Sequence, residues 1–304
     1  MGHSHPSPRS TGGAPLPEPA TPAGRDGLAA LLADPGRAVV ALDFDGTLAE
    51  IVPDPEQARA HPGAVPALVR LAPHLRSVVV ITGRPAEVAV RYGGFAGVPG
   101  LERLVVLGHY GAERWDAATG AVTAPDPHPG VAAVRAELPG VLASVGAARG
   151  VTETGFAGQL HIEEKGDRAV AVHTRRAPDP QAVFEALREP LGRLAERHGL
   201  IVEPGRLVLE LRPPGMDKGV ALNGYLAESD AGPVLYAGDD LGDLAALGAV
   251  EARRAEGLPG LLVCSGSSEV AELAARADLV VDGPKGVVGL LDALADELAP
   301  PRTG

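Results

Sequence analysis

Residues 38–47, with the sequence AVVALDFDGT, decide the fold class of this chain. The five apolar residues from Ala38 to Leu42 predict a strand that is buried on both faces, and such strands are typical of parallel sheets covered by helices. Similar apolar runs recur at residues 78–81, 104–107, 234–237, 261–264 and 279–281. Helical patterns separate several of them, at residues 85–91, 241–247 and 270–277, the last behind a predicted N-cap at Ser267. This alternation predicts an α/β fold with a doubly wound parallel sheet.

A different pattern interrupts the alternation between residues 114 and 206. A helical stretch at residues 131–145 precedes two strand-like runs, at residues 159–163 and 169–174, which are joined by a turn. A helix followed by a hairpin is not expected in a parallel sheet, because parallel strands need a crossover between them.

A second helix and a second hairpin complete this segment. Asp179 is a predicted N-cap before Pro180, and the helix runs towards His198, with Pro190 expected to kink or split it. Residues on either side of Pro204-Gly205 alternate as hairpin strands do. The segment is therefore predicted to be an inserted α+β (αββαββ) cap domain over the α/β core.

The predicted organisation follows from these patterns. Residues 1–25 are rich in Pro, Ser and Gly, show no apolar periodicity and are predicted to be a disordered tail. The core is predicted to consist of residues 26–113 and 207–304, and the cap of residues 114–206.

Composition limits the classes of function. The 304 residues include 27 Lys and Arg against 39 Asp and Glu, a net charge of −12, which argues against binding of nucleic acid or anionic lipid over a broad face. The single cysteine, Cys264, excludes an internal disulfide and fits a cytoplasmic location. No apolar run approaches the roughly 18 to 20 residues of a membrane span, and no signal-peptide pattern begins the chain. We expect a monomeric, cytoplasmic protein with no membrane contact.

Polar residues gather where the predicted strands and helices begin or end. Asp43 and Asp45 follow the first strand, Thr82 follows the second, and Lys218 begins a predicted helix. Three further carboxylates follow the strand at 234–237, namely Asp239, Asp240 and Asp243. Ligands of open α/β sheets bind beyond the carboxyl ends of the strands, so we expect these side chains to form one site.

The residue types at this edge favour phosphoryl chemistry. Carboxylates that converge on one point repel one another unless a cation neutralises them, and an all-oxygen ligand set favours Mg²⁺. Asp43 can act as a nucleophile and Asp45, on the same strand face, as an acid and base. Thr82 offers a hydroxyl group and Lys218 a positive charge for phosphate. Gly46 permits a tight turn directly after Asp45.

Each motif also has a simpler explanation on its own. A calcium loop is excluded at residues 43–54, because the twelfth position is Asp54 and not Glu. Asp239 and Asp240 could merely cap a helix, and Lys218 alone would be a surface lysine. Their occurrence together, each at the end of an element, favours a site.

These residues resemble a known family. Residues 43–48 (DFDGTL), 81–84 (ITGR), 217–219 (DKG) and 238–243 (GDDLGD) look like the four ordered motifs of the haloacid dehalogenase superfamily of phosphatases. The resemblance implies a HAD-like parallel-sheet core with an inserted cap. It also implies that Mg²⁺ is bound by an Asp43 oxygen, the Asp45 carbonyl and Asp239, with Asp240 or Asp243 as support.

Within that superfamily the sequence is most similar to the trehalose-6-phosphate phosphatase family. Residues 108–113 (GHYGAE), 162–165 (IEEK), 171–175 (AVHTR) and 209–213 (LELRP) carry this likeness. The resemblance implies hydrolysis of trehalose 6-phosphate, with catalysis by Asp43, Asp45, Thr82 and Lys218. It implies substrate contacts at Gly46, Thr47, Gly83 and Arg84, and contacts with trehalose hydroxyls at Glu163, Lys165 and Glu210.

Two other functions remain open at this stage. The same core would serve a phosphatase for another sugar phosphate, such as sucrose phosphate, because only the cap distinguishes the sugars. A phospho-acceptor module also combines clustered Asp, Thr and Lys in an α/β fold, but it needs neither a cap nor an acid such as Asp45.

Overall fold

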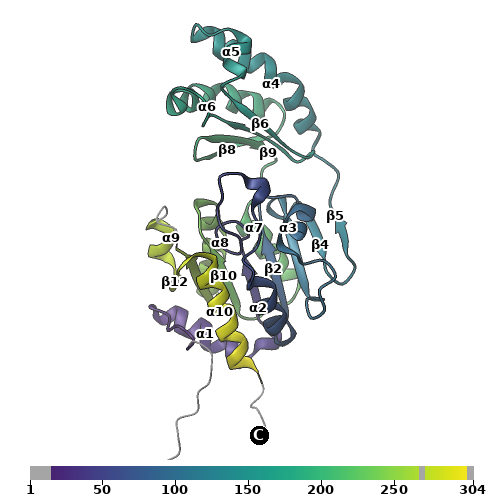
Figure 1. Cartoon of the computed structure of the whole chain (residues 1–304), viewed down its shortest axis with the longest axis vertical. Coiled ribbons are helices and arrows are strands. Elements are labelled where there is room, and N and C mark those ends of the chain that lie inside the picture. The colour runs from purple at the N-terminus through teal and green to yellow at the C-terminus, as the bar shows by residue number, and fades with distance from the viewer. Residues whose placement is uncertain (1–14, 267–270, 300–304) are drawn as a thin grey trace, which may run out of the picture.

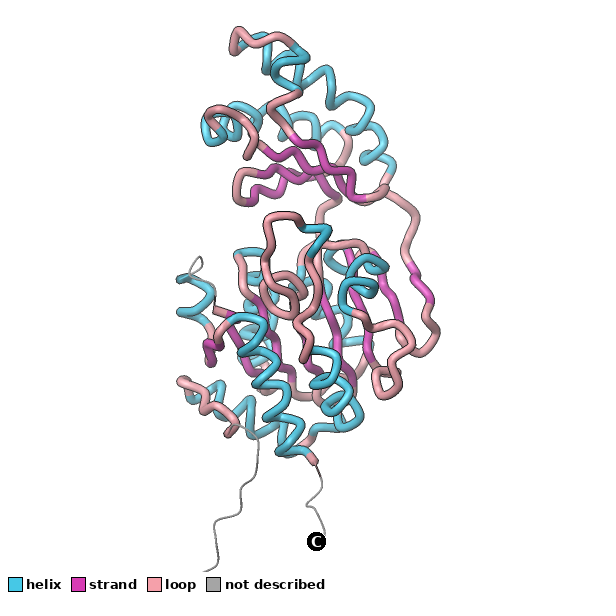
Figure 2. The backbone as a smooth tube through the Cα atoms, in the orientation of Figure 1, coloured by secondary structure: helices cyan, strands magenta, loops and turns pink. Residues whose placement is uncertain are grey.

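The computed structural model describes residues 15–266 and 271–299 and divides them between a large core and a smaller cap (Figures 1 and 2). The core contains an eight-stranded sheet in the order β12-β11-β10-β1-β2-β3-β4-β5. The strands are β1 (Val39–Leu42), β2 (Ser77–Ile81), β3 (Leu104–Gly108), β4 (Glu113–Asp116), β5 (Ala121–Thr123), β10 (Val234–Gly238), β11 (Gly260–Ser265) and β12 (Leu279–Val281). All pairs are parallel except β3–β4 and β4–β5. The predicted α/β parallel sheet is confirmed.

Helices cover both faces of this sheet. They are α1 (Pro22–Ala33), α2 (Ala64–Leu71), α3 (Ala86–Gly93), α7 (Lys218–Glu228), α8 (Leu244–Ala255), α9 (Ala271–Arg276) and α10 (Gly283–Leu298). Five short 3₁₀ helices lie in the described connections: η1 (Pro35–Arg37), η2 (Pro55–Gln57), η3 (Ala72–His74), η4 (His109–Gly111) and η5 (Leu241–Asp243).

The apolar run of β1 is explained by its central position in the sheet. Val40 and Leu42 pack into the cluster that includes α2 and α10, whereas Val39 and Ala41 pack on the opposite face with α7 and α8. Because successive side chains of a strand point to opposite faces, a strand between two helical layers must be apolar at every position.

The cap is a second, antiparallel sheet with helices on one face. Its strands lie in the order β6-β7-β9-β8, and its helices pack on the apolar side chains of β7 and β9. The strands are β6 (His161–Lys165), β7 (Ala169–His173), β8 (Ile201–Gly205) and β9 (Val208–Arg212), and the helices are α4 (Pro129–Ala148), α5 (Glu153–Ala157) and α6 (Pro180–Arg197). The predicted α+β cap is confirmed, with the short α5 as an addition to it.

Strand pairing corrects the predicted domain limits. Strands β4 and β5 continue the core sheet as far as Thr123, and β9 pairs in the cap sheet as far as Arg212. The cap therefore corresponds to residues between Thr123 and Pro213 and not to residues 114–206. The sequence pattern could not settle these limits, because a half-buried strand looks alike in either sheet.

Two local predictions were also wrong. Residues 22–25 belong to α1 and not to a disordered tail, because Thr21 caps this helix by accepting a hydrogen bond from Gly24 N–H. The second hairpin turns at residues 206–207, and Pro204-Gly205 lies within β8. Pro190 does not split α6, because Leu187, Leu191 and Leu194 bury the helix on both sides of it, while the alternative of a kink stays a prediction. The predicted N-cap Ser267 and residues 1–14 lie outside the described residues.

Within the described ranges, α4 is the one helix that is long and apolar enough to cross a membrane by length and composition. The expectation that no segment meets that test is therefore corrected. Val131, Val134, Leu138 and Leu142 of α4 lie in the apolar interior of the cap, and core helices of globular proteins meet the same test.

A buried carboxylate fixes α1 to the far end of the core. Asp278 accepts hydrogen bonds from Leu262 N–H at 2.7 Å, from the Thr21 hydroxyl group and from the Arg254 guanidinium group. Its side chain is 1% exposed, so removing the carboxylate would leave the buried Leu262 N–H group without its acceptor and the Arg254 charge without its partner.

We expect Asp278→Ala to lower the free energy of unfolding by about 3 kcal/mol, because breaking a buried pair leaves an uncompensated charge. Chemical denaturation measures this change. The control is Asp292→Ala, which removes an exposed partner of Arg70 and should cost less than about 1 kcal/mol. Equal effects of the two substitutions would contradict the assignment.

Candidate active site

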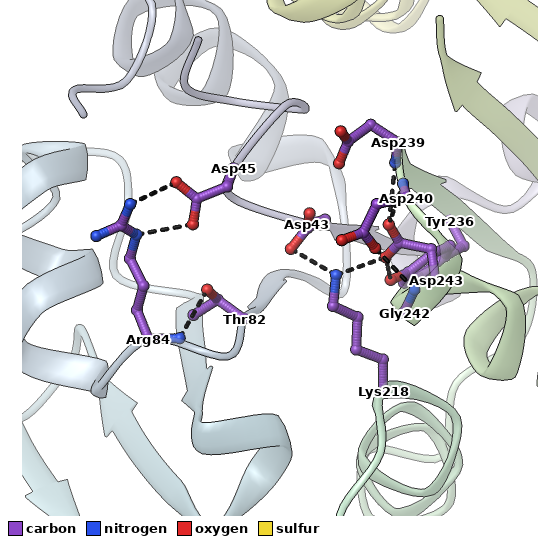
Figure 3. A network of polar contacts seen from close by, with 10 residues as sticks. All are labelled: Asp43, Asp45, Thr82, Arg84, Lys218, Tyr236, Asp239, Asp240, Gly242 and Asp243. Carbon is purple, nitrogen blue, oxygen red and sulfur yellow. Dashed lines mark hydrogen bonds and ion pairs between the residues drawn. The ribbon is translucent and has the colours of Figure 1, made fainter. Parts of the chain in front are cut away.

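The carboxyl edge of the core sheet brings together the motifs predicted from the sequence (Figure 3). Leu42, at the end of β1, pairs with Ala237 on one side and with Val80 on the other. The three strands therefore end nearly level, and the residues that follow them meet at one place. Lys218 reaches the same place from the first turn of α7, where Asp217 caps the helix.

Lys218 is the centre of the polar cluster. Its Nζ lies 2.8 Å from Asp43 Oδ1 and 2.8 Å from Asp243 Oδ1. The three side chains are at most 6% exposed. Burial by itself acts to lower the pKa of the Lys218 ammonium group, but the charges of Asp243 and Asp43 raise it well above its ordinary value. Lys218 therefore carries a positive charge throughout the physiological pH range.

Asp43 is held in a different electrostatic balance. Burial raises the pKa of its carboxyl group well above the ordinary value, Lys218 acts to lower it, and Asp243, Asp240 and Asp239 raise it further. The ionised form of Asp43 thus depends on positive charge in its surroundings, from Lys218 and from any cation bound beside it.

Asp243 is fully engaged by the protein. Oδ1 accepts hydrogen bonds from Lys218 at 2.8 Å and from the Tyr236 hydroxyl group at 2.5 Å, and Oδ2 accepts the backbone N–H groups of Asp239 and Asp240 at 3.0 Å each. Burial acts to raise its pKa, but Lys218 and these hydrogen bonds lower it overall. Asp243 is therefore an ionised carboxylate that fixes the loop after β10.

Asp239 and Asp240 have different roles on the loop after β10. Asp240 caps η5 by accepting the Gly242 N–H at 2.8 Å. Asp239 is 3% exposed. Burial, and then the charges of Asp240 and Asp243, raise the pKa of Asp239 to about 7. A buried carboxyl group with this pKa is expected where a cation normally supplies the compensating charge.

The donor set fits a hard divalent cation. Carboxylate oxygens of Asp43, Asp239 and Asp243 all lie within 4.8 Å of one another and are buried. Because both oxygens of Asp243 already accept protein hydrogen bonds, Asp43 and Asp239 are the carboxylates best placed to hold the ion directly. Asp243 is then an inner support and Asp240 a helix cap. The side chain of Asp45 turns to Arg84, and its backbone carbonyl stays the predicted ligand.

Asp45 is turned towards Arg84 and away from Lys218 (Figure 3). Its carboxylate accepts two hydrogen bonds from that guanidinium group, at 2.7 Å from Nε and 2.6 Å from Nη2. Burial acts to lower the pKa of Arg84, but the hydrogen bond and charge of Asp45, with a smaller contribution from Glu163 of the cap, raise it overall. Arg84 thus lies between the acid–base candidate and the cap.

The remaining predicted core residues line the same edge. Gly46 has φ +75°, and a Cβ there would lie 2.0 Å from Asp239 Oδ2, so only glycine fits beside that carboxylate. Thr82 is buried, and its Oγ1 accepts the Arg84 N–H at 3.1 Å. The hydroxyl group of Thr47 is buried and has no hydrogen-bond partner in the part of the chain that the structure describes. A Cβ on Gly83 would meet the Tyr110 hydroxyl at 2.7 Å.

The cap presents a polar sheet face opposite its apolar one. Ala171 pairs with Glu163 on one side and Glu210 on the other, so these residues form a row across the sheet. Lys165 forms an ion pair with Glu210, and Glu163 lies 2.9 Å from His173 Nε2. All three predicted sugar-binding residues therefore lie on this face, together with His173.

Sequence reasoning missed several contributors. The sequence did not single out Tyr236 as a site residue, because it lies within the apolar run that forms β10. Tyr110 and Arg212, which lie in two quoted motifs, contact each other across the boundary between core and cap, with the guanidinium carbon 5.0 Å from the ring centre. Two signals were available in the sequence. Tyr236 is a residue with a polar group inside an apolar run, and Arg212 lies two positions after the predicted ligand Glu210.

A cavity of about 660 Å³ lies apart from the carboxylate cluster. It is bordered by both connections between core and cap and by the outer side of α7, with Tyr110, Pro127, Pro213 and Val220 among its lining residues. None of the predicted catalytic or metal-binding residues lines it.

The fold of this chain, a parallel sheet core with an inserted cap, is shared with solved structures of haloacid dehalogenase-like proteins. One solved example is the haloacid dehalogenase-like hydrolase from Bacteroides thetaiotaomicron, which is 16% identical, covers 84% of this chain and 98% of its own, and has a TM-score of 0.55.

Comparison with known proteins shows a likeness to one family. Residues 157–281 match the family model described as trehalose-phosphatase. The trehalose-phosphate phosphatase of Mycobacterium avium is 36% identical over 287 residues, or 90% of this chain. The structure of Aspergillus fumigatus trehalose-6-phosphate phosphatase covers 92% of this chain and 99% of its own, with 23% identity and a TM-score of 0.62. The chain spans 65% of the length of the mycobacterial relative. The predicted resemblance to this family is confirmed.

The raised pKa of Asp239 has a consequence for stability. Without a divalent cation, the folded chain binds a proton at Asp239 below about pH 7, whereas its ordinary value is 3.8. The folded state therefore binds more protons than the unfolded state between these values, and the free energy of unfolding should fall as the pH rises from about 4 to about 7.

We expect Mg²⁺ to reverse this loss at pH 7.5, because it binds only the folded, ionised site. The stabilisation should be about 2.7 kcal/mol at a concentration 100-fold above the dissociation constant, measured by thermal unfolding with Mg²⁺ and with EDTA. Asp239→Asn should remove most of the effect, whereas Asp240→Asn should retain it, since Asn also caps helices. Insensitivity of the wild-type protein to Mg²⁺ would contradict the metal assignment.

Proposed function

We propose that this chain is a Mg²⁺-dependent phosphatase that hydrolyses trehalose 6-phosphate to trehalose and phosphate through an aspartyl-phosphate intermediate. The observation that carries the proposal is the buried Asp43, whose Oδ1 lies 2.8 Å from Lys218 Nζ in a cluster of carboxylates suited to a divalent cation. The match to the trehalose-phosphatase family supports the substrate.

Asp43 is the proposed nucleophile. Its carboxylate attacks phosphorus, a bond forms between its oxygen and phosphorus, and the bond from phosphorus to the sugar oxygen breaks. Lys218 keeps the carboxylate ionised and donates hydrogen bonds to the oxygens around phosphorus, as transfer of a phosphoryl group requires. The Thr82 hydroxyl group is also buried and is a second donor to the oxygens around phosphorus.

Asp45 is the proposed acid and base. It protonates the departing sugar oxygen and then takes a proton from the water that hydrolyses the aspartyl phosphate, which regenerates Asp43. In this structure Asp45 is bound by Arg84 through two hydrogen bonds. We infer that Arg84 exchanges Asp45 for the substrate when the substrate binds.

Asp43, Asp239 and the Asp45 carbonyl would hold Mg²⁺, and Asp243 fixes the loop that carries Asp239. The ion supplies charge neutralisation at the phosphoryl oxygens and offsets the mutual repulsion of the carboxylates.

The polar cap face is the proposed sugar site. Glu163, Lys165 and Glu210 provide charged acceptors and donors on a sheet face that borders Arg84. Sugar hydroxyls can exchange with the existing Lys165–Glu210 ion pair, because they both donate and accept hydrogen bonds.

Sucrose phosphate is the alternative substrate, since the core would act on it in the same way. A phospho-acceptor role is disfavoured by the cap. The cytoplasmic location and monomeric state stay predictions.

Asp43→Asn should lower phosphate release from trehalose 6-phosphate by at least about 1000-fold, because the amide cannot form the intermediate. A phosphate-release assay with Mg²⁺ measures this. Asp54→Asn, on an exposed loop, is the control and should keep full activity. Wild-type-like turnover by a folded Asp43→Asn protein would refute the mechanism.

Substitution in the cap should separate recognition of the sugar from the chemical step. We expect Lys165→Met and Glu210→Gln to raise KM for trehalose 6-phosphate by about tenfold or more, while hydrolysis of p-nitrophenyl phosphate stays near the wild-type rate. Assay of sucrose phosphate and glucose 6-phosphate beside trehalose 6-phosphate identifies the preferred sugar. An equal loss on every substrate would mean that the cap residues act on the core and not on the sugar.

A further inference from the structure

The polar face of the cap includes a buried cation that the proposed mechanism does not use. Arg212 is the last residue of β9 and is 5% exposed. It lies two positions after Glu210, so the two side chains leave the same face of the strand, while Leu209 and Leu211 pack against the cap helices.

The guanidinium group of Arg212 has more donors than partners. Nη2 donates to Glu203 at 3.0 Å, whereas Nε and Nη1 are buried without a hydrogen-bond partner among the described residues. Arg135 also has a buried Nε of this kind, but that atom lies 3.2 Å from the Glu164 carboxylate. Two unmatched N–H groups on one buried cation require an explanation, and a ligand that supplies oxygen is one.

The ring of Tyr110 lies against this guanidinium group. The Arg212 guanidinium carbon lies 5.0 Å from the centre of the Tyr110 ring, which is the geometry of a cation–π contact. Tyr110 has φ +56° and follows His109 at φ +46°, so two successive residues adopt the left-handed conformation that side chains rarely take. Strain of this kind is typical of positions that serve a site.

The surroundings of Tyr110 place the pair at the border of the two halves of the site. Burial, followed by the charge of Glu210, raises the pKa of the Tyr110 hydroxyl group, and Lys165, Lys218 and Arg212 act to lower it. The hydroxyl group is therefore near the predicted sugar contacts of the cap and the lysine of the phosphoryl site.

We propose that Arg212 is a further substrate-binding residue, which donates hydrogen bonds from Nε and Nη1 to hydroxyl oxygens of the sugar. The proposal rests on the proposed function. The fixed fork of an arginine suits two neighbouring oxygens, such as adjacent hydroxyls of a sugar ring. We assign it to the sugar and not to the phosphate because Arg212 shares its sheet face with Glu210, whereas the phosphoryl donors come from the core.

The test compares two ligands that each represent half of the substrate. Trehalose carries the sugar without phosphate, and inorganic phosphate carries the anion without sugar. Arg212→Met, which keeps the apolar stem, should weaken binding of trehalose by about 10- to 100-fold by titration calorimetry. Binding of phosphate should change by less than about twofold, and KM for trehalose 6-phosphate should rise while p-nitrophenyl phosphate turnover is unchanged.

Three controls isolate the effect. Arg135→Met removes an arginine from the cap that pairs with Glu164 and Asp167, and Glu203→Gln removes only the charge of the Arg212 partner; both should bind trehalose as the wild type does. Arg212→Lys retains the charge without the fork and should restore less than full affinity. If Arg212→Met fails to fold by circular dichroism, Tyr110→Leu should weaken trehalose binding and Tyr110→Phe should not.

Two results would overturn the proposal: wild-type affinity for trehalose in folded Arg212→Met, or a loss of phosphate binding in place of trehalose binding. A wild-type chain that neither binds trehalose nor releases phosphate from trehalose 6-phosphate would refute the proposed function and this proposal with it. That outcome is distinguishable, because the wild type fails and not the variant alone.

Discussion

The contact of Lys218 with Asp43 and Asp243 is the interaction on which the rest of the site depends. Several carboxylates are buried at one sheet edge, and burying like charges together is costly unless a counter-charge lies within a few ångströms. One ammonium group contacts two of them at 2.8 Å, and backbone N–H groups and Tyr236 satisfy the other acceptors of Asp243. The charge that remains is the charge that a divalent cation would offset.

The local balance also explains how an acidic chain can recognise an anion. The net charge of −12 is a property of the whole surface, where solvent screens it over about 10 Å. Lys218 and Arg84 act at contact distance within the site. The overall sign of charge therefore argues against broad binding of polyanions, which stays a prediction, and does not argue against a phosphate monoester.

Sequence patterns predicted the core well because its strands are apolar at every position and are followed by the motif residues. They predicted that Asp43, Asp239 and Lys218 would meet, since level strand ends follow from parallel pairing. They could not predict that Asp45 would bind Arg84, because pairing between two loops depends on side-chain geometry. They also misplaced β9, since the alternation of Val208–Arg212 suits any half-buried strand, and its partner β7 decides which sheet it joins.

The contact between Arg212 and Tyr110 has a consequence for modularity. The core sheet pairs without help from the cap, and the cap has its own apolar interior, so the cap could be exchanged between relatives as a cassette. Arg212, however, stacks on a ring that belongs to the core. In a chimaera whose cap has a different residue at position 212, the contact with Tyr110 would be lost unless residue 110 were replaced together with the cap. The junction thus ties the cap sheet to one aromatic side chain of the core.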